Sequence, residues 1–269
     1  MGATLERIRA KVTRAKQHVQ DFQLGLQAFY ATNPYEVGIK EDPKSGKRIY
    51  YVTKADSVPD ELTTIAADIL QNLRTPLDQM AYQLVLDARG GTPPDWKVYY
   101  PISGSATDYP ATRGGQIKGV RQEIIDAIDA TEPYKGGKGH ALWQLNELNK
   151  IDKHQLMVGA CTVLDAVDLS PQIKGIFKWM NAQPGAACYG VDFSPLIQPF
   201  YVRPARVIRL NVGDELDPAE DKVKSKRPYI FSVSLYAPGI IEREPALKAL
   251  QDFTNLIDEI ILKLGRLLP

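Results

Sequence analysis

An apolar stripe between residues 62 and 88 constrains the fold more than any other feature of the sequence. Its members recur every three or four residues, as on the buried face of a helix. They are Leu62, Ile65, Ala66, Ile69, Leu73, Leu77, Met80, Ala81, Leu84 and Ala88. Pro76 interrupts the stripe, and Thr75-Pro76 is also typical of a helix start. Because the stripe keeps its phase across the proline, we predict one kinked helix over about residues 58–89 rather than two helices.

Two further helices with a heptad pattern are predicted at the ends of the chain, at about residues 4–30 and 245–267. The first seam consists of Leu5, Ile8, Val12, Ala15, Val19, Phe22, Leu26 and Phe29. The second consists of Ala246, Leu250, Phe253, Ile257, Ile260, Leu264 and Leu267. We expect the two helices to pack lengthwise on each other within one chain, which needs no partner. The alternative is packing across the axis of a homodimer.

The remaining sequence predicts shorter helices and a β-rich region. Helical spacing marks residues 118–130 and 140–156. β-Branched and aromatic residues mark a hairpin at 35–54 and, within 172–237, strands at 173–179, 207–212 and 229–236. The run at 156–168 fits either a buried helix or a strand. A Gly- and Pro-rich connection at 90–115 is too long for a simple turn, so we expect it to wrap the surface and cover another part of the molecule.

No change of composition marks a linker, so we predict a single α+β domain over residues 1–269. In it, a bundle of long helices packs with an antiparallel β-sheet. The chain is 44% hydrophobic, which is enough for a substantial core.

Composition excludes several classes of function. A net charge of +1 gives no overall field that would attract nucleic acid. Cys161 and Cys188 form neither a disulfide framework nor a zinc motif, and the three histidines lack ligand spacing, so we expect no metal and no cofactor. A charged N-terminus without an apolar core, and the lack of an apolar run of about 18 residues, predict a cytoplasmic protein without a membrane partner. No recognised catalytic motif occurs, so the sequence leaves open whether the chain is an enzyme.

A polar centre is predicted between the central helix and the helix at 140–156. Asp152 falls within the apolar stripe of Leu142, Leu145, Leu148 and Leu156, where a carboxylate needs a partner. We expect that partner to be Arg74, and we place Arg74, Asp78, Asn149, Asp152 and Lys153 in this centre. Arg74 and Asp78 are four residues apart, so an ordinary surface ion pair is the alternative for these two.

Two groups of basic residues have both a structural and a functional interpretation. Arg7, Lys11 and Arg14 line one exposed face of the first helix, either as a solvated surface or as contacts to a nucleic-acid backbone. Lys135, Gly136, Gly137 and Lys138 precede a helix N-terminus, either as an anion site or as a flexible loop between helices.

The segments NLRTPLDQMAYQL and LNELNKIDKHQLM, with YYPI and EPY between them, resemble a widespread bacterial family of uncharacterised proteins. Members carry an N-L-R-S-A-L-D-H-like helix and an N-x-I-D-K-H-like helix, and the likeness covers about residues 60–160. The first of these helices is also similar to HEPN-type helical domains. In those domains an arginine, followed four to six residues later by a histidine, forms a metal-independent ribonuclease site, usually across a dimer. Arg74 matches that arginine, but Gln79 stands in place of the histidine, and glutamine cannot transfer a proton.

The sequence therefore leaves three possible functions. The first is a non-catalytic or degenerate HEPN-like binding or regulatory protein whose polar centre is structural. The second is a metal-independent ribonuclease in which Arg74 and His154 act on RNA. The third is an enzyme or binding protein for a small anionic ligand at the Gly-rich loop 135–140.

Overall fold

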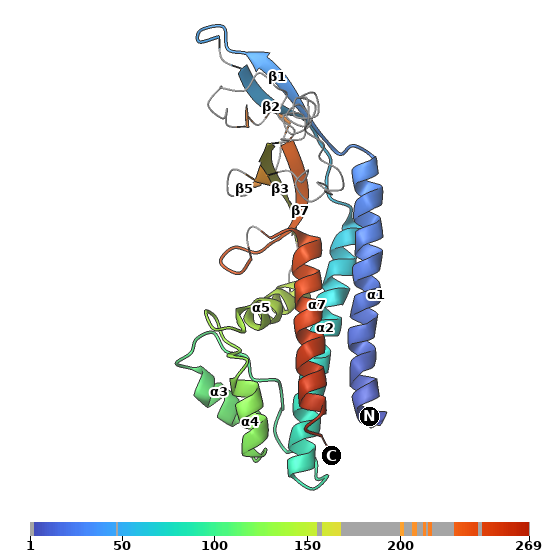
Figure 1. The fold of residues 1–269 in the computed structure, drawn as a ribbon, viewed down its shortest axis with the longest axis vertical. Helices are drawn as coiled ribbons and strands as arrows, with labels where there is room; N and C mark the ends of the chain where they lie inside the picture. Colours follow the sequence, from blue (N-terminus) through green and yellow to red (C-terminus); the bar gives the residue numbers. More distant parts are fainter. Residues whose placement is uncertain are drawn as a thin grey trace, which may run out of the picture. The chain divides into compact units, whose positions relative to one another are not determined.

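A computed structural model describes residues 3–46, 48–154, 158–167, 200–201, 206–208, 212–213, 215–216, 229–241 and 244–268. The predicted α+β class is confirmed, with six helices and seven strands within these residues (Figure 1). The chain forms two compact units. The first comprises Met1–Thr32, Val58–Gly159 and Ser234–Pro269, and the second comprises Asn33–Ser57 and Ala160–Val233. That residues 1–269 fold as one cooperative domain stays a prediction.

The central helix of the first unit, α2 (Asp60–Ala88), is continuous through Pro76, as predicted. Every member of its predicted apolar stripe is buried except Ile65 and Ala88. The helix ends where Gly90 and Gly91 adopt positive φ angles and donate their N–H groups to the carbonyls of Asp87 and Leu86. Such a C-terminal motif favours glycine because other residues are strained at positive φ. The predicted kink stays a prediction.

Helices α1 (Ala3–Ala31) and α7 (Ala246–Gly265) lie beside α2 and beside each other (Figure 1). Every residue of the first predicted seam is buried, and so is every residue of the second except Leu267. The approach of α1 to α7 is close, since a Cβ added at Gly265 would lie 2.6 Å from a methyl carbon of Leu5. Lys16 Nζ on α1 also lies 2.5 Å from Asp258 Oδ2 on α7. No helix in the described part of the chain is long and apolar enough to cross a membrane.

Three shorter helices complete the first unit. α5 (His140–His154) packs against α2 and α7, and Gln144 Nε2 donates to the carbonyl oxygen of Ile240 at 2.7 Å. The predicted helix 118–130 is shorter than expected, because α4 (Gln122–Asp129) begins only after Gly119 at φ +78°.

The interpretation of residues 90–115 as an irregular connection was incomplete, because it contains most of α3 (Tyr109–Gln116). Pro110 and two glycines hid this helix from a search for helical sequence patterns. The connection does cover α2, as described for Tyr100 below.

The described strands of the second unit include the predicted hairpin, β1 (Tyr35–Glu41) and β2 (Arg48–Ala55). Asp42 closes its turn by accepting the N–H of Lys44 at 3.0 Å, and β6 (Glu215–Leu216) pairs with the other edge of β2. A second sheet has the order β4-β3-β5, and β7 also pairs with β3. Its strands are β3 (Val158–Val167), β4 (Phe200–Tyr201), β5 (Arg206–Ile208) and β7 (Tyr229–Tyr236).

The strand predictions within 172–237 have a mixed outcome. β7 lies where a strand was expected, and β5 begins the expected strand 207–212, although Val212 lies in a turn. The run at 156–168, which was ambiguous, forms β3. The strand predicted at 173–179 lies outside the described residues.

Candidate functional site

Arg74 on α2 is the only arginine or lysine among the buried residues of the described part of the chain, with 8% of its surface exposed. It directly follows Leu73 in the apolar stripe, which brings its stem into the core. Burial of an unpaired charge costs several kcal/mol, so its guanidinium needs acceptors close by.

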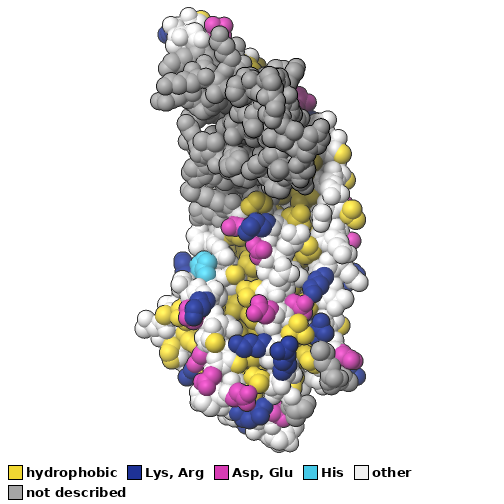
Figure 2. Space-filling model, viewed as in Figure 1, with side chains coloured by type: hydrophobic (Ala, Val, Ile, Leu, Met, Phe, Trp, Pro, Cys, Tyr) yellow, Lys and Arg dark blue, Asp and Glu magenta, His cyan; other side chains and the backbone are white. Residues whose placement is uncertain are grey.

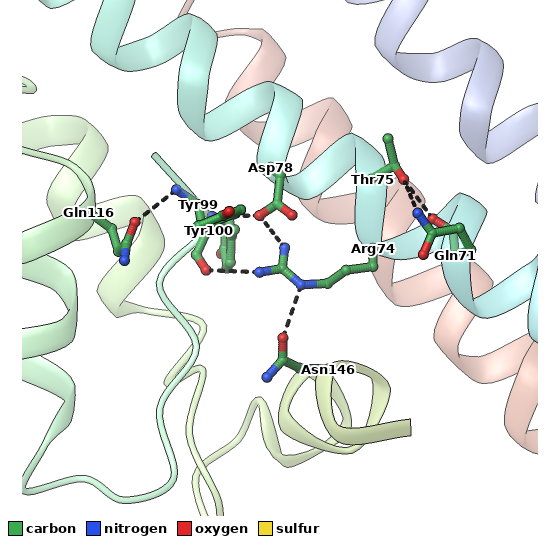
Figure 3. A network of polar contacts seen from close by, with 8 residues as sticks. All are labelled: Gln71, Arg74, Thr75, Asp78, Tyr99, Tyr100, Gln116 and Asn146. Carbon is green, nitrogen blue, oxygen red and sulfur yellow. Dashed lines mark hydrogen bonds and ion pairs between the residues drawn. The ribbon is translucent and has the colours of Figure 1, made fainter. Parts of the chain in front are cut away.

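Each guanidinium nitrogen has such an acceptor (Figure 3). Nε donates to Asn146 Oδ1 at 3.1 Å, Nη1 donates to Asp78 Oδ1 in an ion pair, and Nη2 donates to the carbonyl oxygen of Tyr100 at 3.4 Å. Asp78 lies one turn further along α2, Asn146 lies on α5, and Tyr100 lies in the connection after α2. Arg74 therefore joins three segments that are far apart in the sequence.

The backbone of Tyr100 is held from both sides. Its N–H donates to the same Asp78 Oδ1 at 2.9 Å, while its carbonyl accepts from Arg74. The side chain is buried, and its hydroxyl lies 3.3 Å from Thr131 Oγ1. Burial raises the pKa of Tyr100 to about 12, although the hydrogen bond to Thr131 and the charge of Arg74 act in the opposite direction. The hydroxyl is therefore neutral at physiological pH and acts as an anchor.

The part of the network on α5 continues toward the surface. Asn146 Nδ2 donates to Glu147 Oε1 at 3.1 Å, and the same oxygen lies 2.7 Å from Lys150 Nζ. Asn149, one turn after Asn146, is 4% exposed, and its Oδ1 has no hydrogen-bond partner among the described residues. A buried amide oxygen in this state costs about 1–3 kcal/mol.

The structure brings together only part of the predicted polar centre. Arg74 and Asp78 meet, and with Arg74 largely buried they are not the ordinary surface pair considered above. The side chains of Asp152, Lys153 and His154 lie outside the described part of the chain, so their roles stay predictions. Sequence reasoning missed Asn146, which the stripe of α5 could have indicated. It also missed Tyr100, whose contacts with Asp78 and Arg74 are made by the backbone and leave no sequence signal.

The Gly-rich loop before α5 is folded onto itself. Gly136 donates its N–H to His140 Nδ1 at 3.1 Å, and Lys138 donates its N–H to Glu132 Oε2 at 3.0 Å. Lys138 Nζ also lies 2.9 Å from Glu132 Oε1, and the two hydrogen bonds from Lys138 hold the pKa of Glu132 below its ordinary value. The main chain approaches Gly139 so closely that a Cβ there would lie 2.5 Å from the carbonyl oxygen of Thr131.

The expected anion site at Lys135, Gly136, Gly137 and Lys138 therefore has few groups left for a ligand. Gly137 donates its N–H to the carbonyl oxygen of Tyr134, and Lys135 Nζ lies 4.6 Å from the centre of the Trp143 ring. Anion binding here stays a prediction, and the internal contacts favour the structural interpretation of the loop. They also indicate that the loop is well fixed rather than flexible.

On α1, Arg7, Lys11 and Arg14 are exposed, as expected. Arg14 Nη1 donates to Gln17 Oε1 at 3.3 Å, and neither Arg7 nor Lys11 forms an ion pair within the described residues. Their contact with nucleic acid stays a prediction.

Among the described residues, no three His, Cys, Asp or Glu side chains lie together as metal ligands would. In comparisons with known proteins, no family model, no curated protein and no solved structure matches the chain.

Proposed function

We propose that this protein is a non-catalytic binding or regulatory protein of HEPN-like helical type, in which Arg74 is a structural clamp. One observation carries the proposal: all three guanidinium nitrogens are bound inside the protein, and only 8% of the residue is exposed. Those contacts join α2, α5 and the connection that contains Tyr100. We therefore interpret Arg74 as a residue that stabilises the fold.

A catalytic role in RNA cleavage would place different demands on Arg74. To stabilise a phosphate, a guanidinium must offer N–H groups to the ligand in a fixed, accessible geometry. Here each nitrogen already has an acceptor, and Asp78 neutralises the charge. Gln79, the position that a catalytic histidine would occupy, is exposed but has no titratable group.

The test is a metal-free cleavage assay on a labelled single-stranded RNA. We expect no cleavage above a buffer control by the native protein, and no difference for His154→Ala. Arg74→Lys serves as the charge-preserving variant, and its fold is checked by circular dichroism. Metal-independent cleavage that is lost in both His154→Ala and a folded Arg74→Lys would overturn the proposal in favour of a ribonuclease.

The proposal includes heptad-type packing of α1 on α7 within one chain, rather than across a homodimer. It is supported by the burial of both apolar seams and by the ion pair between Lys16 and Asp258. Light scattering coupled to size-exclusion chromatography should give the mass of a single chain. A dimer that Lys16→Glu dissociates would contradict this part of the proposal.

A further inference from the structure

An indole ring with two cations lies outside the polar centre. Arg89 Cζ lies 5.1 Å from the centre of the Trp96 ring, and Lys118 Nζ lies 5.2 Å from the same centre. The two positive charges are therefore at most about 10 Å apart, close to the Debye length at physiological salt. An anion that lies between or beside them would be attracted by both.

No carboxylate of the described residues pairs with either cation. Three other basic side chains of the first unit are paired with a carboxylate: Arg74 with Asp78, Arg113 with Asp129, and Lys138 with Glu132. On the face seen in Figure 2, charges of both signs are likewise interspersed over the helices. The C-terminal end of α2 offers Arg89 only partial negative charge, and it offers nothing to neutralise Lys118.

The Trp96 ring is held in place by Gln116. Trp96 Nε1 donates to the carbonyl oxygen of Gln116 at 3.3 Å, and Gln116 Oε1 accepts the N–H of Tyr99 at 2.9 Å (Figure 3). The Trp96 ring and the backbone of Tyr99 therefore share Gln116 as an anchor. The side chain of Tyr99 is 44% exposed, so a ligand can reach this aromatic ring.

We infer that Arg89, Trp96, Tyr99 and Lys118 form a nucleotide-binding surface. The two cations take a phosphate group, Trp96 keeps them in position by cation–π contact, and Tyr99 stacks on the base. The inference rests on the proposed function, because a protein whose polar centre is a closed clamp must bind its ligand elsewhere. The shared chemistry is an aromatic base with a phosphate, supplied either by a free mononucleotide or by a single strand.

Binding to the full chain is measured with three probes: inorganic phosphate, adenosine monophosphate, and a fluorescent single-stranded RNA of about 12 nucleotides at about 50 mM salt. The test variant is Arg89→Gln/Lys118→Gln. Its matched control is Lys263→Gln/Arg266→Gln, which removes two exposed charges near the end of α7 that form no ion pair within the described residues. For the stacking step, Tyr99→Ala is compared with Tyr236→Ala, since Tyr236 is 39% exposed.

We expect the mononucleotide, the RNA or both to bind, and which of them binds identifies the source of the ligand. Arg89→Gln/Lys118→Gln and Tyr99→Ala should each weaken binding about tenfold or more, whereas both controls should change it less than about twofold. The inference is overturned if no nucleotide probe binds, or if both charge pairs weaken binding equally. It is also overturned if only the control pair of charges matters, or if inorganic phosphate binds as tightly as the nucleotide and Tyr99→Ala has no effect. Cleavage of the RNA probe would instead refute the proposed function, so the two failures are distinguishable.

Discussion

Replacing Arg74 by methionine tests whether the network is a structural clamp. Methionine keeps an unbranched apolar stem but removes every donor, so Asn146 Oδ1 and the Tyr100 carbonyl lose their partner and Asp78 loses its counter-charge. Two hydrogen bonds from the guanidinium to neutral oxygens, one of them 3.4 Å long, contribute about 1 kcal/mol each, and an unpaired carboxylate that is 26% exposed adds about 1–2 kcal/mol more. We therefore expect the free energy of unfolding to fall by about 3–4 kcal/mol, measured by urea titration of the helical signal at 222 nm.

A second substitution separates charge from shape. In the Arg74→Met background, Asp78→Asn keeps an oxygen that can accept the N–H of Tyr100 but removes the unpaired charge. It should recover about 1 kcal/mol, whereas the same substitution in the native protein should be destabilising. The reasoning is refuted if Arg74→Met costs less than about 1 kcal/mol, which is the range of a surface ion pair, or if Asp78→Asn is destabilising in both backgrounds.

Three further predictions concern single positions. Because the pKa of Tyr100 is raised to about 12, the folded state keeps a proton that the unfolded chain loses near pH 10. The contribution of Tyr100 to stability should thus be constant below about pH 10 and fall by about 3 kcal/mol as the pH rises to 12. In urea titrations across this range, Tyr100→Phe should lose about 3 kcal/mol less than the native protein. Gly139→Ala should lower the unfolding temperature, because its Cβ would meet the carbonyl oxygen of Thr131 at 2.5 Å; Gly115→Ala, which meets nothing within 4 Å, is the control. Asn149→Leu should raise the free energy of unfolding by about 1 kcal/mol, since the buried Oδ1 has no partner; a loss would reveal a bond that this oxygen accepts in solution.

Most of the helices could be predicted because a long buried face repeats its spacing many times. The stripe of α2 is regular enough to outweigh Pro76, and both terminal seams are buried as the spacing requires. α3 (Tyr109–Gln116) could not be predicted this way, because only Tyr109 of this helix is buried and there is no repeat to detect. The same limit made residues 156–168 ambiguous, since a short apolar run fits a strand and a helix equally well.

The candidate site was predictable in position but not in its partners. The argument that a carboxylate in a core stripe must be paired named Asp152 and chose Arg74 as its partner. Arg74 is buried and paired, whereas its pairing with Asp152 stays a prediction. The choice of Asp152 as partner rested on helix phase alone. Within the described residues the acceptors are Asp78, one turn away, Asn146 on α5, and a backbone carbonyl at Tyr100. Every residue type has a backbone carbonyl, so no sequence pattern could have indicated that the carbonyl of Tyr100 is an acceptor.

Arg74 on α2 and Arg89 at the C-terminus of this helix are the same residue type but have different contacts. These contacts indicate that Arg74 has a structural role and that Arg89 can bind a ligand. Arg74 is buried, neutralised one turn away and bound at every guanidinium nitrogen, so a ligand could reach it only by breaking the clamp. Arg89, which caps the C-terminus of α2, is exposed and shares an indole ring with Lys118, and no carboxylate of the described residues pairs with it. An anion could reach Arg89 without breaking an ion pair among these residues. The search for a ligand therefore belongs at Arg89, and substitutions at Arg74 should change stability before they change binding.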